Sequence, residues 1–300
     1  LILCLWMKGF GQDSKPKKKL KRNIHKRPSK EQIINQAINF HIQGNIPEAI
    51  KYYQYCINQG LVDHRVFSNY GVILQSNSKL QEAELSYRKA IELKPDYAEA
   101  HSNLGIILKD LGKLQDAELS YRKAIELKPD YAEAHSNLGI ILKDLGKLQE
   151  AELSTRKAIK IKSNFSEAHY NLGNILKDLG KFEEAEKSHR KAIELKPYYL
   201  QAHYNLGNIL KDLGKFEEAE KSYRKAIELN PDFADAHSNL GLILKDFGKL
   251  KEAEKSTRKA IELNPDFADA HSNLGIMLHD LGKFEEAEKS YRKAIELNPD

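Results

Sequence analysis

The feature that most constrains this chain is a period of 34 residues. Seven glycines recur at that spacing, as do most of the prolines: Gly71, Gly105, Gly139, Gly173, Gly207, Gly241 and Gly275, with Pro95, Pro129, Pro197, Pro231, Pro265 and Pro299. Neighbouring segments are close to copies, and residues 97–115 are identical to residues 131–149. Self-similarity at a fixed period of this length indicates a repeat array, in which each unit buries its apolar faces against its neighbours.

The period divides the chain into a tail and a set of repeat units. Residues 1–29 are predicted to form a disordered basic N-terminal tail, because residues 1–30 hold ten Lys and Arg and one acid, Asp13. A degenerate unit follows at 30–63, where Gln36 and Ala37 replace the Leu-Gly pair of later units; an atypical terminal unit is expected of a cap. Seven regular units are then predicted at 64–97, 98–131, 132–165, 166–199, 200–233, 234–267 and 268–300.

Each unit has the pattern of two helices. In the unit that begins at Ala98 (position 1), apolar residues at helical spacing predict a helix over about 99–111, which Gly112 ends as a left-handed residue. A second helix is predicted over about 114–127, with Tyr121 on its buried face and Pro129 beyond its end. Asp130 stands three residues before Glu133, which predicts a capping box for the next helix.

The repeated residues resemble those of a known family. The spacing of Leu104, Gly105, Leu108, Ala117, Tyr121, Ala124 and Pro129 resembles the tetratricopeptide repeat (TPR), with His in place of the usual Trp at position 4. The resemblance covers residues 30–300. It implies an all-α fold, a right-handed α-solenoid of about eight helix-turn-helix units, with the first helix of each unit lining the concave side.

Three ladders of polar residues follow this first helix. Position 6 is Asn in seven successive units, position 12 is Lys in five, and position 13 is Asp in six. These predicted peptide-binding residues are Asn69, Asn103, Asn137, Asn171, Asn205, Asn239 and Asn273; Lys109, Lys143, Lys177, Lys211 and Lys245; and Asp110, Asp144, Asp178, Asp212, Asp246 and Asp280.

The asparagines allow two interpretations. Asn is a poor helix former, so its retention in mid-helix calls for a reason. Its amide has both donors and an acceptor and can hold the backbone of an extended peptide; alternatively, it can stabilise the array by bonding a neighbouring helix, or it reflects recent duplication. The ladder also resembles the TPR superhelix of the O-linked N-acetylglucosamine transferases, which implies the peptide-holding role. A chaperone-type carboxylate clamp is disfavoured, because position 2 is mostly acidic, as at Glu99 and Glu133.

Other residue patterns argue against a catalytic or metal site. Six histidines recur at position 4, but stacked helices hold such rings about 8–10 Å apart, too far to share a zinc ion; they are predicted to be half-buried packing residues. Glu186, Arg190, Lys191 and Glu194 predict a solvated convex face on the second helix. No phosphate loop or nucleophile motif occurs, so no cofactor, metal or catalytic residue is predicted, and Cys56 is expected to be a buried, inert thiol.

The predicted function is a scaffold that binds a protein or an extended peptide in the concave groove. The alternative is the substrate-recognition arm of a larger enzyme, such as an O-linked glycosyltransferase with its catalytic domain beyond Asp300. The segment from Lys15 to Lys30 is a candidate for weak contact with nucleic acid or another anionic surface. No membrane span is predicted, the expected compartment is the cytoplasm, or the nucleus in a eukaryote, and Met7 is a candidate for the true start.

Overall fold

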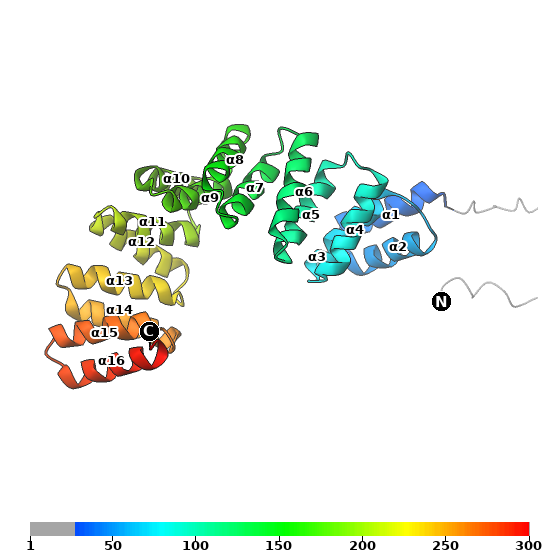
Figure 1. Ribbon diagram of the computed structural model, residues 1–300. Helices are drawn as coiled ribbons and strands as arrows, with labels where there is room; N and C mark the ends of the chain where they lie inside the picture. The colour runs from blue at the N-terminus through cyan, green and yellow to red at the C-terminus, as the bar shows by residue number, and fades with distance from the viewer. Residues whose placement is uncertain (1–27, 300) are drawn as a thin grey trace, which may run out of the picture. The chain divides into compact units, whose positions relative to one another are not determined.

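A computed structural model describes residues 28–299, and all of its regular structure in that part is helical. The predicted tail at 1–29 therefore lies outside the described residues, apart from 28 and 29. The helices follow one another in pairs joined by short turns (Figure 1). Their bounds are α1 Lys30–Ile42, α2 Ile46–Asn58, α3 His64–Ser76, α4 Leu80–Leu93, α5 Ala98–Asp110, α6 Leu114–Leu127, α7 Ala132–Asp144, α8 Leu148–Ile161, α9 Ser166–Asp178, α10 Phe182–Leu195, α11 Leu200–Asp212, α12 Phe216–Leu229, α13 Ala234–Asp246, α14 Leu250–Leu263, α15 Ala268–Asp280 and α16 Phe284–Leu297.

The chain separates into two compact units at residue 61. The first contains the α1–α2 pair, which packs around Ala37 and Tyr53 and buries the Cys56 thiol as predicted. Helix α1 begins with a capping box, in which Ser29 Oγ accepts from the Gln32 N–H and Gln32 Oε1 accepts from the Ser29 N–H. The degenerate sequence of 30–63 thus still forms a helix pair.

The second unit, Val62–Asp300, contains seven helix pairs in a continuous stack. Each odd-numbered helix packs on the even-numbered helix that follows it, and each even-numbered helix packs on the next odd-numbered one. Successive odd-numbered helices also approach each other closely, whereas successive even-numbered helices in the described residues do not approach to the same extent. The all-α solenoid that the resemblance implied is confirmed, with the first helix of each pair on the more tightly packed side.

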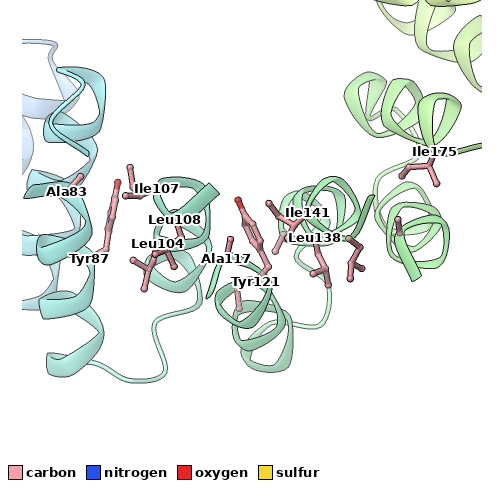
Figure 2. Close-up of a cluster of buried hydrophobic side chains, with 14 of the residues drawn as sticks. Ala83, Tyr87, Leu104, Ile107, Leu108, Ala117, Tyr121, Leu138, Ile141 and Ile175 are labelled. Carbon is pink, nitrogen blue, oxygen red and sulfur yellow. The ribbon is translucent and has the colours of Figure 1, made fainter. Parts of the chain in front are cut away.

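In five of the seven pairs of the second unit, an aromatic ring of the second helix covers a glycine of the first helix, and in the other two Thr155 and Thr257 take the place of the ring. Tyr121 is 1% exposed, and its ring covers Gly105 so closely that a Cβ at Gly105 would lie 2.8 Å from Tyr121 Cζ. On its other side the ring reaches the next pair: Figure 2 shows Tyr121 beside Ile141, just as Tyr87 lies beside Ile107. One side chain therefore bridges the two helices of its own unit and the first helix of the next.

The turn inside each pair ends the first helix with a left-handed residue, which is glycine as predicted except at Ser78 between α3 and α4. Gly112 has a φ of 73°, a left-handed conformation that other residues adopt at a cost. The Lys113 N–H donates to the Leu108 carbonyl at 2.8 Å, and the Gly112 N–H donates to the Lys109 carbonyl at 2.8 Å. These two bonds form a Schellman motif and use carbonyls that a helix end leaves unpaired.

The predicted capping box at Asp130 and Glu133 is wrong. Helix α7 begins one residue later than the box requires, with Tyr131 at the N-cap and no side-chain capping bond. The turn is instead closed by a histidine: His135 Nε2 lies 3.1 Å from the carbonyl oxygen of Pro129. The same bond recurs at His101, His169, His203, His237 and His271, each to the carbonyl six residues earlier. Because a carbonyl can only accept, Nε2 carries the proton, and these histidines hold the turn as well as pack.

The predicted solvated face of the second helices also needs correction. Glu186 is only 9% exposed; its carboxylate accepts from Arg190 Nε at 2.9 Å and from Lys215 Nζ of the next unit at 2.7 Å. These hydrogen bonds and charges hold the pKa of the Glu186 carboxyl below its ordinary value, although burial opposes them as the largest single cause. Equivalent glutamates link each neighbouring pair of units, namely Glu84, Glu118, Glu152, Glu220 and Glu254. Only the outer charges of the set, such as Arg190 and Glu194, are exposed.

Candidate functional site

The three predicted ladders lie along the odd-numbered helices of the second unit. All seven asparagines at position 6 are half-buried, and all six aspartates at position 13 are exposed. The lysines at position 12 are exposed at Lys109 and Lys177 and half-buried in the other three units. In most pairs the first helix thus presents the amide of position 6 on the same face as the Lys of position 12 and the Asp of position 13.

Three of the asparagines make hydrogen bonds between successive odd-numbered helices, and a fourth, Asn137, bonds the Tyr121 hydroxyl of the preceding unit. Asn205 Nδ2 donates to Asn174 Oδ1 at 2.8 Å and lies 3.2 Å from the Tyr170 hydroxyl, both on the preceding odd-numbered helix. Asn239 repeats this arrangement one unit later with Asn208 and Tyr204. Asn171 Nδ2 donates to Ser136 Oγ at 3.2 Å. These contacts match the interpretation in which Asn ties one repeat to the next.

These hydrogen bonds leave the amide oxygen of each asparagine available to a ligand. In these three residues the donor NH₂ group is used, while Oδ1 accepts no hydrogen bond from the described residues. An Asn can therefore fix the spacing of two helices with its nitrogen and still offer its oxygen to a ligand. The two interpretations of the ladder do not exclude each other, and the peptide-binding role of the ladder residues stays a prediction.

The charged ladders are joined in only a few places. Lys143 Nζ lies 3.2 Å from Asp178 Oδ2 of the next unit, and Lys245 Nζ lies 3.7 Å from Asp246 Oδ1 of its own. Three acids at position 2 are paired within their units, Glu99 with Lys128, Glu133 with Lys162 and Glu167 with Lys196. Asp235 and Asp269, at the same position, have no ion pair within the described residues, so they add to the charges of positions 12 and 13 on this face.

The structure also contains grooves that the sequence reasoning missed. One of about 870 Å³ lies between α12 and α14, with Ile227, Leu240 and Leu244 among its lining residues and Arg224 and Lys255 among its charged ones. Smaller grooves recur between α4 and α6, α6 and α8, α8 and α10, and α10 and α12. For two of the smaller grooves the signal in the sequence was the Leu at position 22: Leu119 and Leu153 line them, and these residues and Leu85 are about 70% exposed.

The described residues hold neither a metal cluster nor a membrane span. No group of three or more His, Cys, Asp or Glu side chains within 28–299 is arranged to bind a metal ion. The position-4 histidines are instead engaged with backbone carbonyls. In the same part of the chain, no helix is both long and apolar enough to cross a bilayer.

Comparison with known proteins identifies the family to which the helix pairs are similar. Family models described as TPR repeat match residues 71–112, 107–146 and 207–248, and models described as tetratricopeptide repeat match 132–165, 166–199, 190–221, 234–267 and 268–300. Together they cover residues 71–300 without a gap. The comparison with curated proteins found no match.

Solved structures give the same result. The crystal structure of YrrB, described as a TPR protein with an unusual peptide-binding site, is 28% identical, with a TM-score of 0.53 over 60% of this chain and 93% of that one. The crystal structure of MamA is also 28% identical, with a TM-score of 0.52 over 54% of this chain and 95% of that one. PilF of Pseudomonas aeruginosa, at 20% identity and a TM-score of 0.61 over 67% and 92%, shares the fold alone. With its helix pairs, its ring-on-glycine contacts and these matches, the chain belongs to the tetratricopeptide repeat family.

Proposed function

We propose that this chain is a protein-interaction scaffold that holds an extended polypeptide segment against the odd-numbered helices of residues 62–300. The observation that carries the proposal is the half-buried asparagine ladder, whose bonded members keep Oδ1 open while Nδ2 is used between units. An open carbonyl oxygen repeated at each rung suits the N–H groups of an extended backbone, which recur along a peptide irrespective of its side chains.

Relatives of the same family support this function. YrrB, to which this chain is 28% identical, is described as having a peptide-binding site. The exposed Lys and Asp ladders beside the asparagines supply charges that can select among peptides without excluding most of them. Binding is thus expected to come from many weak contacts spread over the units.

The test removes the ladder asparagines one at a time. We would measure the affinity of the full chain for an array of synthetic extended peptides, and then replace one, two and three of Asn103, Asn137 and Asn273 with Ala. The affinity for bound peptides is expected to fall by a similar factor at each step. A matched control replaces the same number of lysines on the even-numbered helices, at Lys187, Lys221 and Lys255, and should leave the affinity unchanged.

Two outcomes would count against the proposal. Equal losses from the asparagine and lysine series would place binding elsewhere, on the grooves between the even-numbered helices. A complete loss from one rung with no effect of the others would contradict the idea of many weak contacts.

The alternative role, as the substrate-recognition arm of a larger enzyme such as an O-linked glycosyltransferase, has the asparagine ladder as its only support. It uses the same peptide-holding surface and differs in requiring a catalytic domain beyond Asp300. It stays a prediction, as do contact of the Lys15–Lys30 segment with nucleic acid and the expected compartment.

A further inference from the structure

The asparagine-bearing face is not uniform along the array. At position 9, which lies one turn after the ladder asparagine, two neighbouring units carry Asn174 and Asn208, whereas the other five units carry aliphatic residues. The aliphatic set is Val72, Ile106 and Ile140 before the two asparagines, and Leu242 and Ile276 after them. All seven of these side chains are half-buried, so each presents part of its surface on this face.

The same two units differ at position 5. Tyr170 and Tyr204 stand where the other regular units have Ser, as at Ser102 and Ser136. Their rings lie against the aromatic residues that end their own units, with centroids 4.9 Å apart for Tyr170 and Tyr199 and 4.8 Å for Tyr204 and Phe233. Residues 166–233 therefore form a polar and aromatic stretch between two aliphatic ones.

Hydrogen bonding orients the two extra asparagines. Asn174 Oδ1 accepts from Asn205 Nδ2 at 2.8 Å, and Asn208 Oδ1 accepts from Asn239 Nδ2 at 3.2 Å and from the Tyr223 hydroxyl at 2.8 Å. The Nδ2 group of Asn174 makes no hydrogen bond to the described residues, whereas the Asn208 amide is also hydrogen-bonded to the Tyr204 hydroxyl. With the open Oδ1 of Asn171 and Asn205, this stretch offers both donors and acceptors, whereas the aliphatic rungs add only apolar surface at position 9.

We propose that this face binds its partner in a fixed register. This proposal rests on the function proposed above. The partner is an extended polypeptide segment with a polar, hydrogen-bonding centre on residues 166–233 and aliphatic side chains on both flanks. Its centre contacts Asn174 and Asn208, and its flanks contact the aliphatic position-9 residues of the units on either side.

The dimensions of the repeat set the length of the polar centre. Packed helices lie about 8–10 Å apart, and an extended chain advances about 3.3 Å per residue, so each unit spans about three residues of the partner. Two units then correspond to a polar centre of about six residues. Because aliphatic position-9 residues lie on both sides of the two asparagines, the partner can bind with its chain running in either direction.

The preference for a polar centre follows from the cost of unpaired amides. An aliphatic side chain placed on Asn174 would cover its Nδ2 group and remove that group from water without giving it an acceptor. A register shift by two units would also bring polar residues against Ile140 and Leu242. We expect a segment with the inverted pattern to bind about 10- to 100-fold more weakly, the range that one unpaired buried group produces.

The experiment compares two synthetic peptides of about 18 residues, a length that spans six units at the spacing above. One has a centre of Ser, Thr and Gln with flanks rich in Leu and Val, and the other has the same residues rearranged, with the polar residues divided between the two ends and the Leu and Val residues in the centre. The full chain is expected to prefer the first peptide by at least about tenfold in a fluorescence anisotropy titration.

The array supplies its own matched variants. Asn174→Ile introduces the residue that Ile140 supplies one unit earlier, and it should reduce the preference severalfold. Ile276→Asn adds an amide outside the polar stretch and should leave the order of the two peptides unchanged. Asn208→Ile is less suitable, because it also removes a partner of the buried Tyr223 hydroxyl. Thermal melts of each variant report whether the fold is retained.

The outcomes separate this inference from the function on which it rests. If the full chain binds both peptides equally well, or if Asn174→Ile leaves the preference unchanged, the fixed register is wrong and peptide binding stands. If neither peptide binds, and the general peptide array gives no binder either, both proposals fail.

Discussion

A buried histidine in the middle of the array should make its stability depend on pH. His189 occupies position 24, where Tyr121 and Tyr223 stand in other units, and its ring covers Gly173 as those rings cover their glycines. The side chain is fully buried, and neither ring nitrogen has a hydrogen-bond partner within the described residues. Burial, with a smaller contribution from the charge of Lys177, lowers the pKa of His189 from 6.5 to about 4.

The difference between the unfolded pKa of 6.5 and the folded pKa of about 4 sets the sign and size of the pH effect on stability. Below pH 6.5 the unfolded chain binds a proton at this residue that the folded chain refuses, so the free energy of unfolding falls as the pH falls. The slope is about 1.4 kcal/mol per pH unit between pH 6.5 and 4, which amounts to about 2 kcal/mol at pH 5. His189→Tyr removes this dependence and inserts the residue the repeat uses elsewhere. Because an unpaired buried polar group costs about 1–3 kcal/mol, the variant should also be more stable at pH 7.

The assay is urea denaturation of wild type and His189→Tyr at pH 7.5, 6 and 5, with the loss of helix monitored by circular dichroism. The other histidines are the same in the two proteins, so their contributions cancel in the difference, including that of His135, whose pKa is lowered by burial. Because a repeat array can unfold unit by unit, hydrogen exchange at pH 5 should show the loss of protection concentrated over 166–199. A stability difference between the two proteins that stays constant from pH 7.5 to 5 would refute the reasoning, whatever its size at neutral pH.

Three further changes test the packing and the ion pairs by thermal or urea denaturation. Gly105→Ala places a methyl group 2.8 Å from the Tyr121 ring and should cost about 1–3 kcal/mol, whereas an unchanged melting temperature would mean that the ring moves freely. Leu172→Ala truncates a side chain that is 4% exposed and should cost about 2–5 kcal/mol; a shift within error would show that the site collapses. Glu118→Gln weakens the bonds to Arg122 and Lys147 and should cost about 1–3 kcal/mol at pH 7. Since the pKa of Glu118 is lowered from 4.5, that stabilisation is present above pH 4.5 and is lost at lower pH, so a difference that persists undiminished at pH 3 would contradict the assignment.

The fold was predictable because its signals recur at a fixed spacing. The second helix predicted over 114–127 has those bounds in α6, and the left-handed residue predicted at Gly112 has a φ of 73°. Both features depend on backbone geometry and local apolar spacing, which a sequence shows directly. Repetition reinforced them, because the same pattern returned in each regular unit.

Contacts between units were harder to predict, because they depend on which side chain lies opposite which. The sequence showed Glu186 and Arg190 as an i, i+4 pair on an outer face, but not that Lys215, 29 residues away, would reach the same carboxylate. The error at Asp130 has a related cause: Asp favours an N-cap by local propensity, yet the turn is closed by the bond between His135 and Pro129, and the N-cap of α7 is Tyr131. In both cases tertiary contacts decided what local propensity left open.

The candidate site and the core of the array are coupled through the same side chains. The Tyr223 hydroxyl, on a ring buried against Gly207, donates to Asn208 Oδ1 at 2.8 Å, and Asn208 in turn accepts from Asn239 of the next unit. A partner that displaced Asn208 would therefore disturb a core ring and a contact between units, whereas at Asn174 the adjacent ring is that of His189, which forms no such bond. The two asparagines are alike in sequence but differ in how firmly the core holds them. We therefore expect the loss of affinity from Asn174→Ile to occur without a change in melting temperature comparable to that of Asn208→Ile. Equal destabilisation by the two substitutions would show that the bond from Tyr223 contributes little to either role.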